Sequence, residues 1–191
     1  MKLLNESQFD DITYQQIADD AGIPLASCYH FYKSKLDLIR VLADEITDEY
    51  LAVVLARDRF KSFDNWRDCV AALVRYTVEH HNKNPAELQI FFGGSVSFKI
   101  RLDAVRREKM IGTNFQDILK CKFDLPPLED GETIFFRAIE IGRTVLALDF
   151  QEKGLLNDFS ITEATRALTG YLAFYLPTVL NPKTVEPDKI Q

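Results

Sequence analysis

Cysteine is scarce in this 191-residue chain: Cys28, Cys69 and Cys121 lie far apart and form no Cys-x-x-Cys pair. Because the number is odd, at least one thiol stays unpaired, and a disulfide framework is not expected. No group of cysteine and histidine has the spacing of a zinc module. We interpret the three as small apolar residues in a reducing compartment, with a redox-sensing thiol as the alternative.

Glycine and proline are also few, at 8 and 7 residues, and they are scattered, which excludes collagen-like and low-complexity sequences. No apolar run approaches the roughly 18 to 20 residues that span a bilayer. The first residues, Met1 to Glu6, turn polar too early for a signal peptide. The sequence therefore predicts a cytoplasmic protein without a membrane partner.

Common catalytic motifs are missing: Gly-x-Ser-x-Gly, His-Glu-x-x-His, Gly-x-Gly-x-x-Gly and the phosphate-loop pattern do not occur. We expect no enzyme and no cofactor. His80 and His81 follow Glu79, but adjacent helix residues point about 100° apart, so joint metal coordination is not expected. The net charge of −6 argues against nonspecific coating of nucleic acid, although a local DNA-reading face remains compatible with it.

Apolar residues recur at helical spacing, so the sequence predicts an all-α protein. Thr13 and Gln16 form a capping-box pattern for the first clear helix, and Gly22 suits its left-handed stop. A second capping box is predicted at Ser160 and Glu163. The predicted helices cover residues 13–21, 24–31, 35–56, 65–82, 85–93, 97–123, 132–151 and 160–180.

The stretch from Ile12 to Lys35, ITYQQIADDAGIPLASCYHFYKSK, resembles the helix-turn-helix of the tetracycline-repressor (TetR) family over about residues 9–45. The resemblance implies a DNA-binding domain at residues 1–45, with an incomplete first helix, and a helical bundle for ligand binding and dimerisation at 46–191. The matching residues are Ile17-Ala18, Ala21-Gly22-Ile23, Tyr29-His30, Tyr32, Ser34-Lys35 and Leu38.

In such a motif the start of the second helix enters the major groove. The resemblance implies that Ser27, Tyr29 and Lys35 contact phosphates, for which hydroxyls and an ammonium are suited. It also implies that Leu25, Ala26 and His30 face base edges or the adjoining backbone, and Thr13 and Lys33 complete the expected DNA-binding set. As alternatives, Tyr29 and Tyr32 are core aromatics, His30 is solvated, and Lys35 simply begins the next helix.

The sequence departs from the family pattern in two ways. Only about ten residues precede Ile12, and Leu3, Leu4 and Phe9 are interpreted as the end of a shortened first helix. Residues 1–40 contain four Lys or Arg against six Asp or Glu, a net charge of −2. A negative head releases few counterions, which predicts weak DNA binding.

Helix 132–151 has two apolar stripes that together cover about 200°, whereas a surface helix needs only about 100°. The stripe containing Ile139 and Leu146 is predicted to face a second copy of the chain. Helix 160–180 adds Ala167, Gly170 and Phe174, where another helix can approach closely. The alternative is one well-packed bundle without a dimer, but the resemblance implies a two-fold dimer on a palindromic operator in double-stranded DNA.

In the TetR family the middle helices enclose a small-molecule cavity, so an apolar or aromatic effector is expected. Plain core packing is the alternative for each aromatic residue, and His80 or Arg143 is a candidate polar anchor. The basic residues Lys99, Arg101, Arg106, Arg107 and Lys109 are interpreted as a solvated face. The candidate ligand-binding residues are Trp66, Tyr76, His80, Phe91, Phe98, Phe115, Phe136 and Arg143.

Taken together, these features predict a ligand-responsive, dimeric DNA-binding transcriptional regulator, a repressor released from its operator by a small molecule. The alternative is a helical protein-binding or ligand-binding module that has lost DNA binding.

Overall fold

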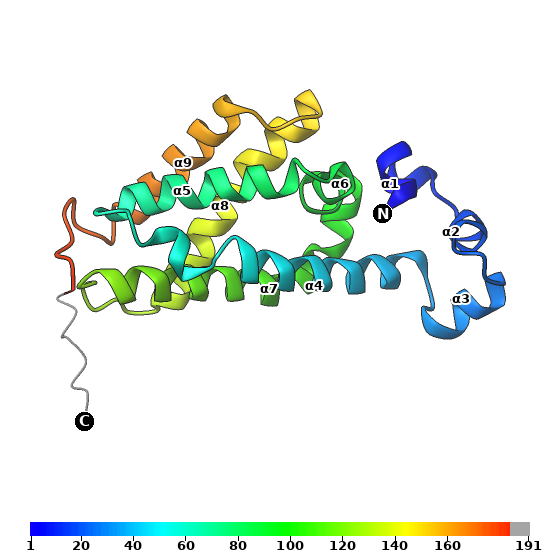
Figure 1. The fold of residues 1–191 in the computed structure, drawn as a ribbon, viewed down its shortest axis with the longest axis horizontal. Coiled ribbons are helices and arrows are strands. Elements are labelled where there is room, and N and C mark those ends of the chain that lie inside the picture. The colour runs from blue at the N-terminus through cyan, green and yellow to red at the C-terminus, as the bar shows by residue number, and fades with distance from the viewer. Residues whose placement is uncertain (184–191) are drawn as a thin grey trace.

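A computed structural model describes residues 1–183, without the side chains of residues 95–104. The described residues form helices and one isolated bridge between Phe123 and Pro182, which confirms the all-α prediction. The N-terminal elements form a small head at one end of the molecule (Figure 1). They are α1 (Lys2–Glu6), the 3-10 helix η1 (Phe9–Asp11), α2 (Tyr14–Ala21), α3 (Leu25–Phe31) and the start of α4 (Lys35–Val53).

The remaining helices form an elongated body into which α4 runs from the head (Figure 1). In the body α4 packs on α7, while α5 and α8 both pack on α9. None of the helices in the described part of the chain is long and apolar enough to cross a membrane. The body contains the 3-10 helix η2 (Arg57–Phe60), α5 (Trp66–His81), α6 (Pro85–Phe92), α7 (Gly94–Lys122), α8 (Gly131–Lys153) and α9 (Asp158–Leu172).

The helix boundaries of the head follow the predicted caps. The Thr13 hydroxyl accepts a hydrogen bond from the Gln16 backbone N–H, and the Gln16 side chain accepts one from the Thr13 N–H. At the other end of α2, Gly22 has φ 66°, a left-handed conformation that glycine adopts without steric cost. Pro24 then caps α3. These contacts confirm the predicted helix–turn–helix.

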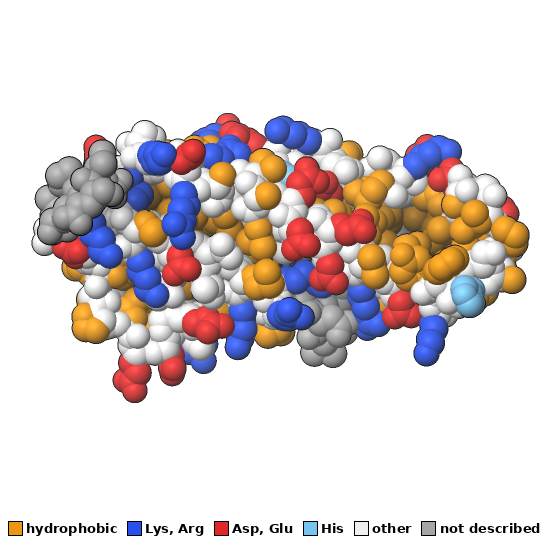
Figure 2. Space-filling model, turned by 60° about the horizontal axis from the view of Figure 1, so that its bottom comes forward, with side chains coloured by type: hydrophobic (Ala, Val, Ile, Leu, Met, Phe, Trp, Pro, Cys, Tyr) orange, Lys and Arg blue, Asp and Glu red, His pale blue; other side chains and the backbone are white. Residues whose placement is uncertain are grey.

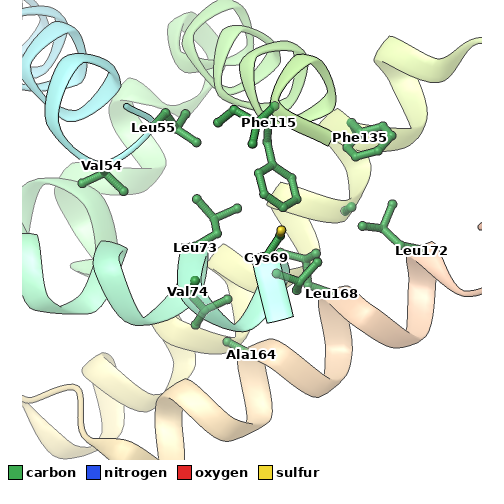
Figure 3. Packing of buried hydrophobic residues seen from close by; sticks show 14 of the residues in the cluster. Val54, Leu55, Cys69, Leu73, Val74, Phe115, Phe135, Ala164, Leu168 and Leu172 are labelled. Atoms are coloured by element: carbon green, nitrogen blue, oxygen red, sulfur yellow. The ribbon is translucent and has the colours of Figure 1, made fainter. Parts of the chain in front are cut away.

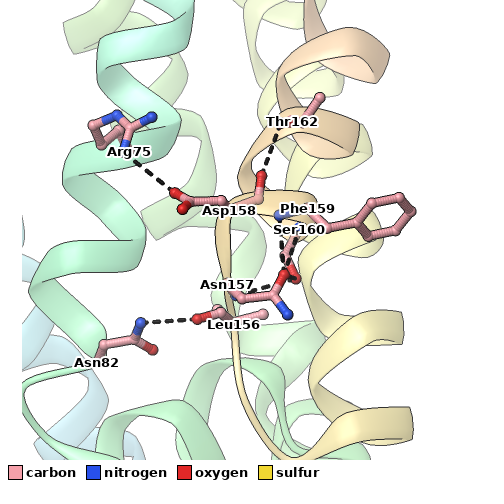
Figure 4. A network of polar contacts seen from close by, with 8 residues as sticks. All are labelled: Arg75, Asn82, Leu156, Asn157, Asp158, Phe159, Ser160 and Thr162. Atoms are coloured by element: carbon pink, nitrogen blue, oxygen red, sulfur yellow. Dashed lines mark hydrogen bonds and ion pairs between the residues drawn. The ribbon is translucent and has the colours of Figure 1, made fainter.

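The predicted start and end of the last helix are wrong. Asn157 is the N-cap, and its side chain accepts hydrogen bonds from the Phe159 and Ser160 N–H groups (Figure 4). Ser160 is the buried third residue of α9, with its hydroxyl turned back to the Asn157 N–H. The helix ends at Leu172, and Pro177 disfavours helical geometry in Leu176, the residue before it, so the helix cannot continue to residue 180.

The chain after α9 is held across α5 by polar contacts. The Trp66 indole N–H donates to the Pro177 carbonyl at 2.9 Å, and the Arg67 guanidinium donates to the Thr178 carbonyl. Trp66 itself is completely buried. Trp66, predicted to contact a ligand, therefore anchors the C-terminal segment to the body.

The body core is continuous through η2, α5, α7, α8 and α9. Figure 3 shows Leu73 and Cys69 of α5 directed towards Phe115 of α7, with Leu168 and Leu172 of α9 on the far side. Burial raises the pKa of the Cys69 thiol to about 11, so this cysteine is an uncharged core residue, as its sequence context predicts.

Helix α8 buries residues of both predicted stripes within its own chain, among them Ile134 and Ala138 of the first. Leu146 is 3% exposed and packs in the body core, and Ile139 is partly buried against that core. Leu148 of the other stripe is 62% exposed. The assignment of Ile139 and Leu146 to a partner surface is therefore wrong, because both side chains line the cavity inside their own chain.

Helices α7 and α8 approach each other closely at Gly112. A Cβ atom there would lie 2.7 Å from the Phe136 backbone nitrogen and 3.0 Å from the Phe135 carbonyl carbon. Such distances are too short for non-bonded atoms, and backbone cannot move aside as a side-chain tip can. Gly112 therefore fixes the spacing of the two helices.

We expect Gly112→Ala to lower the free energy of unfolding by roughly 1–3 kcal/mol, because overpacking against backbone outweighs the gain in helix propensity. Gly94→Ala is the matched control, since among the side chains that the structure describes its Cβ would meet that of Gln151 alone, at 3.7 Å. Urea unfolding followed by far-UV circular dichroism measures both. Equal stability of the two variants would contradict the close approach.

Candidate nucleic-acid interface and ligand cavity

The α2–α3 pair is fixed by Tyr14. Its hydroxyl donates to the Cys28 carbonyl at 3.0 Å and lies 2.8 Å from the Tyr32 carbonyl, so it binds the last turn of α3 and its C-cap. The ring of Tyr14 also meets the ring of Tyr29 edge to face, with centroids 4.8 Å apart. Ala18 is completely buried in this head. The start of α3 is thus presented on a rigid support.

The predicted DNA-contact residues of α3 differ in exposure. Ala26 and His30 are exposed, whereas Leu25 and Ser27 are half-buried. Tyr29 is 51% exposed, which excludes the core-aromatic alternative for this residue.

Two further residues of the expected DNA-binding set, Lys33 and Thr13, and the motif residue Tyr32 lie outside α3. Lys33 is exposed and follows α3 directly. Thr13 is exposed, but its hydroxyl is engaged with Gln16 as the cap of α2. Tyr32, for which a core position was the alternative, is half-buried.

Lys35 is directed into the head. Its ammonium donates to the Phe9 carbonyl at 2.5 Å and to the Ile12 carbonyl, and it stands 4.1 Å from the centre of the Phe9 ring. These carbonyls belong to η1 and its C-cap, where a cation is favourable. The structure thus explains a cation at the start of α4 without a phosphate, in agreement with a structural role for Lys35.

The head has an apolar hollow of about 280 Å³ between α1, α2 and α4. Figure 2 shows hydrophobic side chains gathered around it at the head end of the molecule. Val41, on its rim, is 39% exposed. Near the rim Lys2 pairs with Asp20 at 2.7 Å. The hollow is lined mainly by Leu3, Ile17, Ala21, Leu38, Val41 and Leu42.

Helix α6 joins the head to the body. The Ala86 N–H donates to the Asn5 side-chain oxygen at 2.9 Å, and the Gln89 amide donates to the Leu4 carbonyl at 2.6 Å. Ala86 and Ile90 belong to the same buried cluster as Leu4 of α1. A shift of α6 would therefore displace α1 as well.

A cavity of about 100 Å³ lies in the body beside α6. Its walls come from α4 to α9 and are mostly apolar, as is usual for small-molecule sites. Of the candidate ligand residues, Phe91 and Arg143 line it. The other lining residues are Thr47, Tyr50, Leu73, Val74, Thr77, His81, Ile90, Phe92, Arg107, Glu108, Ile111, Ile139, Gly142, Leu146 and Leu168.

The other candidates lie elsewhere. Trp66 and Phe115 are completely buried core residues, Phe136 is half-buried on α8, and Tyr76 packs against Phe60. The side chain of Phe98 lies outside the described residues, as do those of Lys99 and Arg101. Aromatic spacing alone could not separate cavity walls from core, because both are apolar.

The polar side of the cavity contains arginines that form ion pairs with carboxylates. The Arg143 guanidinium lies 3.2 Å from a Glu108 oxygen and 3.0 Å from a Glu140 oxygen. Arg107 is buried and paired with Asp44, so its assignment to a solvated face is wrong, whereas Arg106 and Lys109 are exposed. Both arginines at the cavity are thus paired with carboxylates of the same chain.

Next to the cavity, two histidines and a glutamate meet. His81 Nδ1 lies 2.9 Å and His80 Nε2 lies 3.6 Å from the same Glu87 oxygen. Burial lowers the pKa of His81 below its usual value. Adjacent helix residues point about 100° apart, yet nitrogens of both histidines approach the same carboxylate because α6 places Glu87 beside them.

Comparison with known proteins identifies the fold. No model of a known protein family matches the sequence, and no curated protein matches it. Among solved structures, the chain is similar to a TetR-family transcriptional regulator from Streptomyces coelicolor, with a TM-score of 0.70 and 22% identity, over 91% of this chain and 93% of that one. The chain therefore has the TetR-like fold that its helix-turn-helix predicted.

We expect Tyr14→Phe to lower the free energy of unfolding by about 1 kcal/mol, because the carbonyls at the end of α3 lose their hydroxyl partner. Tyr29→Phe should change it by less than about 0.5 kcal/mol, since an exposed hydroxyl contributes little to folding. Urea titration measures both, and a larger loss for Tyr29→Phe would contradict the role given to Tyr14.

Proposed function

We propose that this chain is a dimeric, ligand-responsive DNA-binding transcriptional regulator, and specifically a repressor that an apolar or aromatic molecule releases from its operator. The observation that carries the proposal is the capped α2–α3 pair with an exposed face on α3, set on a TetR-like fold. Residues 1–45 form the DNA-binding part, and residues 46–191 bind the effector and the second copy. The proposal includes a cytoplasmic location and no catalytic step.

In this proposal the start of α3 enters the major groove. Ser27, Tyr29 and Lys33 donate to phosphates, which position the head without carrying sequence information. Leu25 has no donor and contributes an apolar contact, such as one with a thymine methyl group, while Ala26 and His30 lie beside it. Thr13 lies at the start of α2, where it contacts the adjoining DNA backbone.

The effector acts through α6. Phe91 and Phe92 line the cavity, whereas Ala86 and Gln89 of the same helix hold α1. An occupant larger than the cavity displaces part of its walls, and α4 and α6 are among them. Movement of either helix changes the position of α3, so ligand and operator favour different arrangements of the head.

The dimer proposal rests on apolar residues that the single chain leaves exposed on α8 and beyond α9. Leu148 is 62% exposed and Phe174 is 88% exposed, with Gly170 exposed one turn before it. Burial of such side chains in a second copy is favourable. A two-fold dimer presents two heads to the two halves of a palindrome.

One observation favours a module without DNA binding as the second candidate function. Residues 1–40 carry a net charge of −2, and Lys35, one of their four cations, is bound to backbone carbonyls. Weak phosphate attraction is the physical consequence. A binding experiment separates the two candidates.

We expect the protein to bind DNA from upstream of its own gene, and three head variants to differ in how they weaken binding. Tyr29→Phe should weaken binding to every sequence about equally, and Lys33→Ala should also reduce the salt slope by about 0.9 for one lost phosphate contact. Leu25→Ala should instead change the preference at one base pair by about 1 kcal/mol or more. Fluorescence anisotropy at several salt concentrations measures all three.

The matched control is Lys120→Ala, which removes an exposed cation from α7, far from α3 in the fold. It should leave affinity and salt slope unchanged. If none of the three head variants differed from this control, the α2–α3 pair would be a structural element, and the module without DNA binding would be the better account.

We expect wild-type protein to sediment as a dimer at micromolar concentration, and the double variant Leu148→Glu/Phe174→Glu to sediment as a monomer with unchanged helicity. Both side chains are exposed, so charges there disturb association and not the core. Phe31→Glu, which changes an exposed aromatic in the head, is the control and should remain a dimer. A monomeric wild type would overturn the proposed dimer.

A further inference from the structure

The junction between α5 and α6 brings three metal-binding side chains together. His80 and His81 end α5, and Glu87 lies in the first turn of α6, after a short connection (Figure 1). One ligand atom from each residue can be chosen so that all three lie within 4.8 Å of one another. His81 and Glu87 are buried, and His80 is nearly so.

The surrounding residues orient all three groups towards one point. The Asn84 amide donates to one Glu87 oxygen at 3.1 Å, while the other oxygen faces the two imidazoles. The Tyr50 ring stacks on His81 with an angle of 6° and meets His80 edge to face. Such support of the ligand side chains is typical of metal sites.

One buried atom in the cluster lacks a hydrogen bond. His80 Nε2 is enclosed and has no hydrogen-bond partner in the described part of the chain, although it lies 3.6 Å from the Glu87 oxygen. A buried polar atom without a partner is costly and calls for an explanation. A metal ion between His80 Nε2 and the Glu87 oxygen would give the nitrogen a partner.

The distances suit a small divalent cation. Metal–ligand bonds of about 2.0–2.2 Å in a tetrahedral site place the ligand atoms about 3.3 Å apart. The two separations from the Glu87 oxygen, 2.9 and 3.6 Å, lie on either side of that value. All three ligand atoms lie within 4.8 Å of one another, so the side chains must rotate to bring the two imidazole nitrogens and the carboxylate onto one ion.

We propose that His80, His81 and Glu87 form a binding site for a divalent transition-metal ion of the zinc and cobalt class. Two imidazoles and one carboxylate favour such ions over Mg²⁺ and Ca²⁺, which prefer oxygen ligands. The fourth position is filled by water or by a group from the cavity, since His81 also lines the cavity wall. The ion ties the first turn of α6 to the end of α5, one residue from the Ala86 contact with the head.

The test uses the full chain without an affinity tag, freed of metal with a chelator and titrated with Co²⁺. We expect one Co²⁺ per chain, with the visible d–d absorption of a low-symmetry nitrogen and oxygen site, and displacement by Zn²⁺ but not by Mg²⁺ or Ca²⁺. His80→Ala and Glu87→Gln should each weaken binding by more than about tenfold. Zn²⁺ should raise the Tm of the wild type and not that of either variant.

The chain offers matched controls for adventitious binding. His30→Ala removes the one histidine outside the cluster, and Cys121→Ser removes the one exposed cysteine of the three. Both should bind Co²⁺ like the wild type. The proposal is overturned if wild type and His80→Ala bind Co²⁺ equally, or if either control loses binding as His80→Ala does. The experiment contains no DNA, so its result is independent of the proposed regulatory function.

Discussion

The position of the head depends on α6, an eight-residue helix that is packed on two sides at once. On one side Ala86 and Ile90 share a buried cluster with Leu4, and on the other Phe92 belongs to the body core. Close-packed interiors transmit displacement instead of absorbing it. The cavity, the histidine–glutamate cluster and the head all meet at this helix, so each can influence the others without a long pathway.

Local chemistry explains how much of the fold could be predicted from sequence. The Thr13–Gln16 box and Gly22 bound α2 as predicted, because caps involve residues only three or four positions apart. Asn65 likewise caps α5 through the Asp68 N–H. The resemblance around α2 and α3 then led to the observed TetR-like fold, although 22% identity to a solved relative lies below what whole-chain sequence comparison detected.

Tertiary contacts explain the errors. Ser160 has the sequence signature of a cap, but the helix begins three residues earlier. Asn157 accepts hydrogen bonds from the Phe159 and Ser160 N–H groups, and Ser160 lies buried in the first turn. Two features depend on how neighbouring helices pack against one another. They are the side of α8 that faces α9 and the contact of His80 with Glu87. The spacing of residues within a single helix contains no information about those neighbours, so cavity walls and core residues looked alike.

The central claim is that two copies of the α2–α3 pair bind DNA together, and hydroxyl-radical footprinting upstream of the gene tests it most directly. The account predicts two protected patches of equal size, related by two-fold symmetry and separated by one helical turn, about 10–10.5 base pairs, or a multiple of it. Protection of both patches should disappear together as salt is raised. An unprotected region, or a single patch without symmetry, would contradict the account.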